Sequence, residues 1–191
     1  MKIFFDTEFT GLHKNATLIS IGLIAESGRE FYAEFCDYDN EQVDEWLKEN
    51  VINNLKFKNC ENFINSNNID FITMKGTKQD VKIALSDWFA GFNNVEMWTD
   101  CGAYDWVLFC DIFNHAFNIP NNIYYIWYDI CTLMNVKGIN SDISREGFIK
   151  NSIYGDKHNS MYDARVIKAC YEKLVNEGEI NEKTIKQERL K

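Results

Sequence analysis

The segment Phe4 to His13 reads FFDTEFTGLH and places two carboxylates, Asp6 and Glu8, directly after an apolar run. If residues 3–9 form a strand, Asp6 and Glu8 point to the same face, because successive side chains alternate. Two like charges on one half-buried face repel each other, so the pair is costly unless a cation or protons offset it. The groups that complete such a site must come from elsewhere in the chain.

The composition fits one globular protein. The chain has 191 residues, of which 46% are hydrophobic, and no apolar run approaches the ~20 residues of a membrane helix. The acids near the start interrupt any secretory signal, so we expect a cytoplasmic protein with no membrane association. Six cysteines without a CxxC pair are interpreted as reduced core residues and not as a zinc site.

The net charge of −9 argues against a protein that grips long duplexes through a general basic surface. It does not exclude nucleic acid as a substrate. Divalent metals in an acidic pocket can bind a phosphate, and the global charge is then a poor guide to the substrate.

The order of strand-like and helix-like patterns indicates a mixed sheet flanked by helices. Strands are expected at residues 2–5, 18–25, 30–36, 95–99 and 123–127, and helices at residues 41–55, 80–92, 104–117 and 161–174. The polar, Asn-rich residues 56–78 are expected to form a loop. We therefore predict an α/β fold whose sheet begins as an antiparallel meander and continues with parallel strands. One domain covers residues 1–175, and a charged tail covers residues 176–191.

Two of the expected helices carry an acid at the N-terminal end of their apolar stripe. These acids are Asp105 and Asp163. Either one alone could be an N-terminal acid that the helix dipole favours. Together with Asp6 and Glu8 they make four carboxylates from three elements, which is the oxygen-rich set that Mg²⁺ or Mn²⁺ prefers. We expect such a site to hold two divalent cations.

A candidate proton acceptor, His158, lies five residues before Asp163. Histidine titrates near neutral pH, so His158 could deprotonate an attacking water, although a surface-loop histidine is the simpler alternative. Chance predicts this spacing only about 0.2 times in the chain, but an acid-x-acid pair about four times. The His-to-Asp spacing is therefore the more specific of the two signals.

Three segments resemble the motifs of the DEDDh 3′–5′ exonucleases, a family with the RNase H-like fold that includes polymerase proofreading subunits, RNase T and oligoribonuclease. The segments are FDTEFTGL (residues 5–12), GAYDWVLF (residues 102–109) and HNSMYDA (residues 158–164), and the resemblance covers residues 3 to about 175. The resemblance implies that the metal ligands are Asp6, Glu8, Asp105 and Asp163, and that His158 is the general base. It also implies that the 3′-terminal nucleotide is held by Phe9, Thr10, Gly11, Leu12 and Tyr104.

Two further aspartates lie near the second motif. Asp100 competes with Asp105 as the second-motif ligand, and we favour Asp105 because Tyr-Asp followed by an apolar helix matches the family, whereas Asp100 ends a strand. Asp129, in WYDICTL at residues 127–133, is interpreted as a supporting residue and not as a ligand.

The resemblance implies a metal-dependent exonuclease that removes nucleotides from the 3′ end of single-stranded RNA or DNA and releases nucleoside 5′-monophosphates. RNA is favoured, because no polymerase-binding extension or second domain is visible. The alternatives are a proofreading-type DNA exonuclease, a non-catalytic RNA-binding module and an RNase H-type endonuclease. Relatives such as oligoribonuclease suggest a homodimer.

Overall fold

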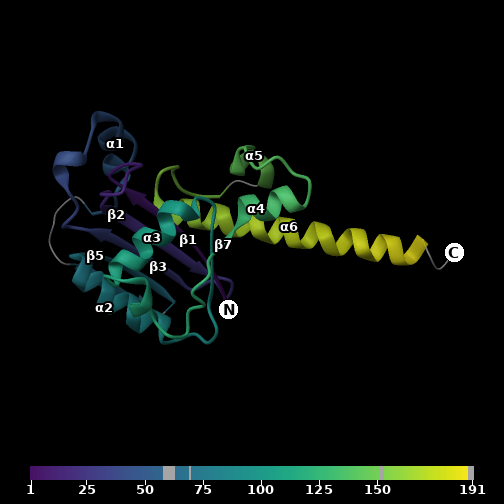
Figure 1. Cartoon of the computed structure of the whole chain (residues 1–191), viewed down its shortest axis with the longest axis horizontal. Helices are drawn as coiled ribbons and strands as arrows, with labels where there is room; N and C mark the ends of the chain where they lie inside the picture. The colour runs from purple at the N-terminus through teal and green to yellow at the C-terminus, as the bar shows by residue number, and fades with distance from the viewer. Residues whose placement is uncertain (58–62, 69, 151–152, 189–191) are drawn as a thin grey trace.

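The computed structural model describes residues 1–57, 63–68, 70–150 and 153–188. Within these residues seven strands form one sheet in the order β4-β5-β3-β2-β1-β6-β7, with helices on both of its faces (Figure 1). The strands are β1 Lys2–Phe9, β2 Leu18–Ala25, β3 Glu30–Phe35, β4 Phe63–Asn68, β5 Phe71–Gly76, β6 Glu96–Thr99 and β7 Tyr128–Asp129. The α-helices are α1 Glu45–Asn50, α2 Lys78–Phe89, α3 Gly102–Ile112, α4 Ile130–Val136, α5 Arg145–Ile149 and α6 Ser160–Glu188.

The sheet is mixed, as the sequence predicts. β1, β2 and β3 form an antiparallel meander, and β6 then pairs with β1 in parallel. β7 extends the sheet in parallel beyond β6, and β5 pairs in parallel with β3 at the other side. This arrangement places β1 near the middle of the sheet, and β6 ends beside the middle of β1, just before Asp6.

Alternation along β1 supplies side chains to both layers of the core. Ile3 and Phe5 pack on the face covered by α2 and α3, and Phe4 packs on the face covered by α4, α5 and α6. β2 is buried along its whole length because both of its faces are covered. These two strands are therefore a rigid base for whatever side chains follow them.

Several of the predicted elements differ from the structure. Residues 56–78 are not simply a loop, because β4 and β5 lie within them and β5 buries Met74 against β3. The helix predicted for residues 41–55 is broken into α1 and two 3₁₀ turns, Asn40–Gln42 and Ile52–Asn54.

The strand predicted for residues 123–127 is also wrong. Only Ile123 makes an isolated bridge, to Val95, and the paired strand β7 begins at Tyr128. The helix expected to reach residue 117 ends at Ile112, because Asn114 takes the left-handed conformation at φ 65°. The last helix, by contrast, continues beyond residue 174 to Glu188, and the division between a domain of residues 1–175 and a tail stays a prediction.

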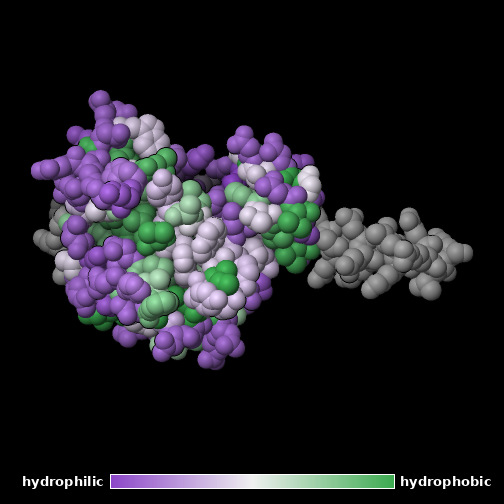
Figure 2. Space-filling view, in the orientation of Figure 1, coloured by the Kyte–Doolittle hydropathy of each residue, from purple (hydrophilic) through white to green (hydrophobic). Residues whose placement is uncertain are grey.

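The cysteine interpretation holds in part. Cys110 and Cys170 are buried and free, but Cys101 is exposed; Cys60 lies outside the described residues. In the part of the chain that the structure describes, no helix is long and apolar enough to span a membrane. On the face shown in Figure 2, hydrophilic residues dominate the regions around α1 and α2, with smaller apolar areas between them.

Candidate active site

The site begins at the C-terminal half of β1. Asp6 and Glu8 are partly buried and lie opposite Gly22 and Ser20 of β2 in the strand register. Thr7, between the two acids, is buried and points to the other face, where it meets α3. The alternation predicted from the sequence is thus the reason that two carboxylates share one side of the strand.

Asp105 enters from the first turn of α3 and is almost fully buried, with 1% of its surface exposed. The Thr7 hydroxyl donates to Oδ1 of Asp105 at 2.6 Å, and the Thr7 backbone N–H donates to the same oxygen at 3.2 Å. The Thr99 hydroxyl donates to Oδ2 at 2.6 Å. Three donors from β1 and β6 therefore fix the orientation of this carboxylate.

Asp163 reaches the site because α6 packs directly on β2. A Cβ added at Gly22 would lie 2.4 Å from backbone atoms of Ser160 and Met161, so only glycine permits this contact. The hydroxyls of Ser20 and Ser160 also hydrogen-bond at 2.9 Å. The first turn of α6 is therefore held against the strand next to β1, and Asp163 lies near Asp6 and Glu8.

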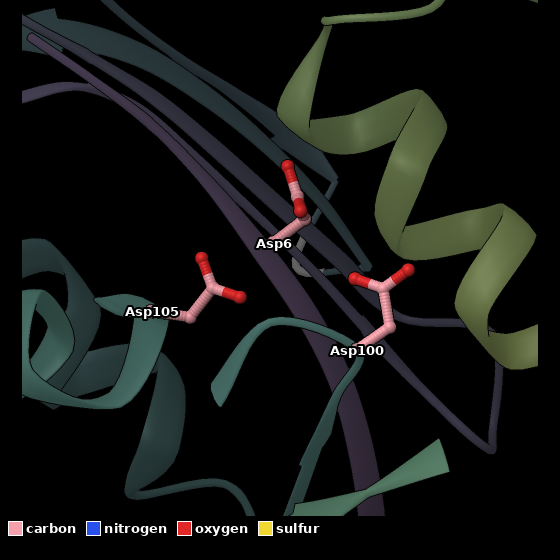
Figure 3. Close-up of side chains that lie close together, drawn as sticks. All are labelled: Asp6, Asp100 and Asp105. Carbon is pink, nitrogen blue, oxygen red and sulfur yellow. The ribbon is translucent and has the colours of Figure 1, made fainter. Parts of the chain in front are cut away.

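The carboxylates form two groups of three that share Asp6. One group is Asp6, Glu8 and Asp163, and the other is Asp6, Asp100 and Asp105; in each group one oxygen per residue lies within 4.8 Å of the others. Figure 3 shows the second group, with Asp6 on β1, Asp105 on α3 and Asp100 just after β6 all pointing toward one space. The four acids of the sequence prediction are thus close together, and a fifth lies with them.

The fifth acid is Asp100, the competitor of Asp105 in the sequence analysis. The sequence contained a usable signal for it, since β6 is parallel to β1 and the carboxyl ends of neighbouring parallel strands meet at one edge of a sheet. The structure places both aspartates in the group, so their positions alone do not decide between them.

Arg145 binds Asp100 and was not found from the sequence. Its Nε donates to Oδ2 of Asp100 at 3.1 Å, and its Nη1 donates to the carbonyls of Ser141 and Ile143 at 2.8 Å. Its Nη2 lies 2.9 Å from Sγ of Cys131. These contacts hold one cation at the edge of an otherwise acidic cluster.

Asp129, which the sequence analysis interprets as a supporting residue, caps a helix beside the site. Its carboxylate accepts from the backbone N–H of Cys131 at 2.7 Å and caps α4, and it does not belong to either carboxylate group. Asp129 therefore shapes the turn that carries Cys131 toward Asp100.

Burial, together with the charges of neighbouring carboxylates, raises the pKa values of these acids. The pKa of Asp6 is raised well above its usual value, first by burial and then by the charges of Asp105, Glu8, Asp163 and Asp100. Burial is also the main cause of the raised pKa values of Glu8, Asp105 and Asp163. Two hydrogen-bonding threonines oppose the rise at Asp105, and Arg145 opposes it at Asp100. The acids favour protons or cations in this space over bare negative charge.

His158 lies in the turn before α6 and is tied to the acids. Its backbone takes the left-handed conformation at φ 62°, and its N–H donates to the carboxylate of Asp163. The pKa of the imidazole is lowered, mainly by partial burial and also by Lys157. Its ring makes an edge contact with Trp46 of α1, with ring centroids 5.2 Å apart.

The residues predicted to hold a nucleotide fall into two kinds. Phe9 and Tyr104 stack on each other with ring centroids 5.5 Å apart, and Leu12 is 72% exposed. Thr10 instead is buried. Its hydroxyl donates a hydrogen bond to Oε1 of Gln42 at 2.5 Å and accepts one from the backbone N–H of Thr17. Thr10 thus shapes the turn, along with Gly11, while Leu12 faces outward and Phe9 and Tyr104 pack in part against the core.

Trp46 is a further exposed aromatic residue near the acids, and no sequence pattern predicts its role. It is 53% exposed although it contacts His158, and it stands in a segment whose helical pattern is interrupted. Its position beside the site depends on how α1 folds back over the turn before α6, which no local pattern reveals.

The comparison with protein families settles the identity of this carboxylate-lined fold. Residues 1–175 match the model described as the 3′-5′ exoribonuclease Rv2179c-like domain. The chain belongs to this family. Its activity is that of a 3′–5′ exoribonuclease, and the hydrolase predicted from the sequence motifs is confirmed at that level.

Two curated relatives of the Rv2179c-like chain are similarly named. 3′-5′ exoribonuclease Rv2179c of Mycobacterium tuberculosis strain H37Rv and 3′-5′ exoribonuclease MT2234.1 of strain CDC 1551 are each 28% identical to it over 125 residues. The aligned part is 64% of this chain and 67% of each relative.

A solved structure shows the same fold. S. pombe Pop2p, in its Mg²⁺- and Mn²⁺-bound form, superposes with a TM-score of 0.59 over 89% of this chain and 81% of Pop2p, at 16% identity. The predicted RNase H-like architecture of this Rv2179c-like domain is therefore confirmed.

Proposed function

We propose that this Rv2179c-like exoribonuclease holds two Mg²⁺ or Mn²⁺ ions between its acids and hydrolyses single-stranded RNA from the 3′ end to nucleoside 5′-monophosphates. The observation that carries the proposal is the pair of carboxylate groups that share Asp6. Two neighbouring ions that share one carboxylate are the arrangement used for in-line displacement at phosphorus.

The donor set fits such ions. Every side chain in both groups is a carboxylate, which is the ligand that hard divalent cations select. The raised pKa values of Asp6 and Glu8 come first from burial and then from mutual repulsion, and a bound cation would offset both costs of the carboxylate charge. Asp6, Glu8 and Asp163 would hold one ion and Asp6 and Asp105 the other, and bound ions supply the positive charge that activates water and stabilises the leaving oxygen.

Asp105 contributes a preset orientation. Its hydrogen bonds to Thr7 and Thr99 keep the carboxylate aimed at Asp6 whether or not substrate is present. Threonine hydroxyls that orient a ligating carboxylate are the kind of outer contact that tunes metal sites. Each of these residues therefore preserves the spacing between the two carboxylate groups.

His158 would take the proton from the attacking water. A lowered pKa keeps the imidazole neutral and able to accept a proton at physiological pH. The hydrogen bond from its backbone to Asp163 holds the base next to the acids, and Trp46 limits the movement of its ring.

The 3′-terminal nucleotide would lie against the exposed apolar side chains around the acids. Leu12 and Trp46 present surfaces on which a base can stack, and the Phe9–Tyr104 pair closes the other side. Thr10 and Gly11 would act by shaping the backbone of the turn between β1 and β2.

The test is the digestion of a 5′-labelled single-stranded RNA and its DNA counterpart in Mn²⁺, in Mg²⁺ and in EDTA. A ladder of single-nucleotide steps that needs metal is expected, with RNA cleaved faster than DNA. His158→Ala should lower kcat by about 10²- to 10⁴-fold, the usual contribution of a general base.

Internal cuts would contradict the exonuclease mechanism, and full activity of His158→Ala would remove His158 from its role. Faster cleavage of DNA would favour the proofreading-type alternative. A cytoplasmic location, a homodimer and a domain boundary at residue 175 stay predictions.

A further inference from the structure

A cationic cavity lies on the other side of α6 from the carboxylates. Its volume is about 390 Å³, and its lining includes Lys56, Arg165, Asn54 and Asn159. Arg165 stands two positions after Asp163, so the two side chains leave the helix in different directions. Asp156 is the one carboxylate among the described residues that line it.

Lys56 forms no salt bridge with any of the residues that the structure describes. Its ammonium group lies 4.6 Å from the centre of the Tyr32 ring. The two acids that act on it are already engaged, Glu34 with Lys75 at 3.3 Å and Glu30 with Arg165 at 2.6 Å. An unpaired lysine facing a cavity is unexpected in a chain of net charge −9.

Arg165 keeps free donors although it is paired. Its Nε and Nη2 donate to the two carboxylate oxygens of Glu30 at 2.8 and 2.6 Å. Its Nη1 makes no hydrogen bond within the described residues. A guanidinium edge beside an ammonium group suits the two non-bridging oxygens of a phosphodiester.

The wall between this cavity and the acids is the His158 turn. Asn54 donates to the carbonyl of Lys157, just before His158, and Asn159, just after it, donates to the carbonyl of Asn54, both at 3.4 Å. Glu30, which holds Arg165, lies on β3, two strands from β1, and hence roughly 10 Å from the acid-bearing strand. The cavity is adjacent to the reaction site but too far away to contact the scissile phosphate.

We propose that Lys56 and Arg165 form a subsite for an internal phosphate of the RNA substrate, upstream of the scissile bond. This inference rests on the proposed function, because it assumes that the 3′ end lies between the acids and Trp46. The strand then continues past the His158 turn, so the protein binds longer RNA more tightly than a dinucleotide.

The first experiment measures the kinetics of each variant relative to wild type in Mn²⁺ on two substrates. The readout is KM for an oligoadenylate of about ten nucleotides and kcat/KM for a dinucleotide. Lys56→Gln should raise KM for the longer RNA about fivefold and leave the dinucleotide unaffected. Lys56→Arg should restore the lower KM. Lys48→Gln is the matched control, since Lys48 is an exposed lysine on α1 that does not line the cavity.

The second experiment removes a negative charge from the cavity and measures how RNA binding depends on salt concentration. Asp156→Asn removes the carboxylate of the cavity and should lower KM for the longer RNA. The slope of log Kd against log salt, measured by fluorescence anisotropy with Ca²⁺ in place of Mn²⁺, should decrease by about 0.7 in Lys56→Gln, the value for one lost phosphate contact on a single strand.

The outcomes separate this subsite from the catalytic proposal. An equal loss on both substrates, or an unchanged salt slope, overturns the subsite while RNA hydrolysis continues. Protein that binds the longer RNA without cleaving it, and whose salt slope decreases by about 0.7 in Lys56→Gln, overturns the catalytic proposal and supports phosphate binding by Lys56. Thermal unfolding of each variant, compared with wild type, shows whether the substitution has altered the fold.

Discussion

Two regions of the protein remove carboxylates from water, and they treat the charge differently. Glu34 in β3 is fully buried, but it accepts from the Tyr32 hydroxyl and the backbone N–H of Lys56 and lies 3.3 Å from Lys75, its cross-strand partner. The pKa values of Asp6 and the acids around it rise because the acids are buried and crowded by each other's charges, even though Asp105 and Asp100 accept hydrogen bonds. The chain itself completes the first region, whereas we propose that cations complete the second.

The largest expected effect comes from removing the acid that both groups share. Asp6→Asn should reduce RNA hydrolysis to background and weaken Mn²⁺ binding measured by calorimetry. The metal-free variant should unfold at a higher temperature than wild type, because a repulsive charge is gone; each kcal/mol corresponds to about 2–4 °C in a chain of this size. A lower melting temperature in EDTA would show that the Asp6 charge is compensated within the chain, as that of Glu34 is.

The complementary change breaks the ion pair between Lys75 and the buried Glu34. Lys75→Met leaves Glu34 buried without its cation and should lower the free energy of unfolding by about 3–5 kcal/mol in urea titrations. Mn²⁺ affinity of the folded fraction should stay unchanged, since Lys75 is far from the acids in the strand order. Loss of Mn²⁺ binding at unchanged stability would reverse the roles of the two regions.

A third change moves the acids without removing any of them. Gly22→Ala forces the first turn of α6 away from β2, because the new Cβ would meet backbone atoms at 2.4 Å. We expect a stability loss of about 1–3 kcal/mol. We also expect a fall in kcat on the order of 10²-fold, as for a displacement of ~1 Å.

Gly147→Ala is the control for this change, since the nearest atoms to its added Cβ are 3.6 Å away. A Gly22→Ala enzyme with wild-type kcat would show that the distance between Asp163 and β1 does not limit the reaction.

A different kind of effect, which needs no substitution, is a dependence of stability on pH in the absence of metal. The pKa is raised to about 8 for Glu8 and to about 7 for Asp105 and Asp163, above their unfolded values near 4. The folded protein therefore binds more protons than the unfolded chain between about pH 4 and 8, and its stability falls as pH rises through that window. In EDTA, melting temperatures should decrease from pH 5 to pH 8.

Mn²⁺ should reverse this trend, because cations replace protons more readily at higher pH. The Asp6→Asn protein should show a flatter profile in EDTA. A wild-type melting temperature that rises with pH in EDTA would contradict the raised pKa values of the acids.

The sequence predicted the parts of the site that local patterns encode. Asp6 and Glu8 follow from strand alternation, and Asp105 and Asp163 from their places at the start of helical stripes, which the structure retains. Arg145 and Trp46 were not predicted, because each lies on a short helix whose position depends on contacts distant in sequence.

The dependence on contacts distant in sequence also explains which parts of the fold were predicted and which were missed. The meander of β1, β2 and β3 is joined by short turns and was found, but β5 pairs with β3 across an intervening segment of about 35 residues, and its sequence FITMKG has a weak strand signal. Polar residues around it favoured a loop, and only the partner strand could have decided otherwise.

The long-range contacts of the site also determine when it can exist. Thr7 bonds Asp105 across 98 positions, and Ser20 bonds Ser160 across 140. During synthesis from the N-terminus, β1 to β3 can pair early, but Asp163 is not available until most of the chain has left the ribosome. On the proposed mechanism, the nascent protein therefore cannot degrade RNA, including the messenger being translated, until Asp163 has joined Asp6 and Glu8.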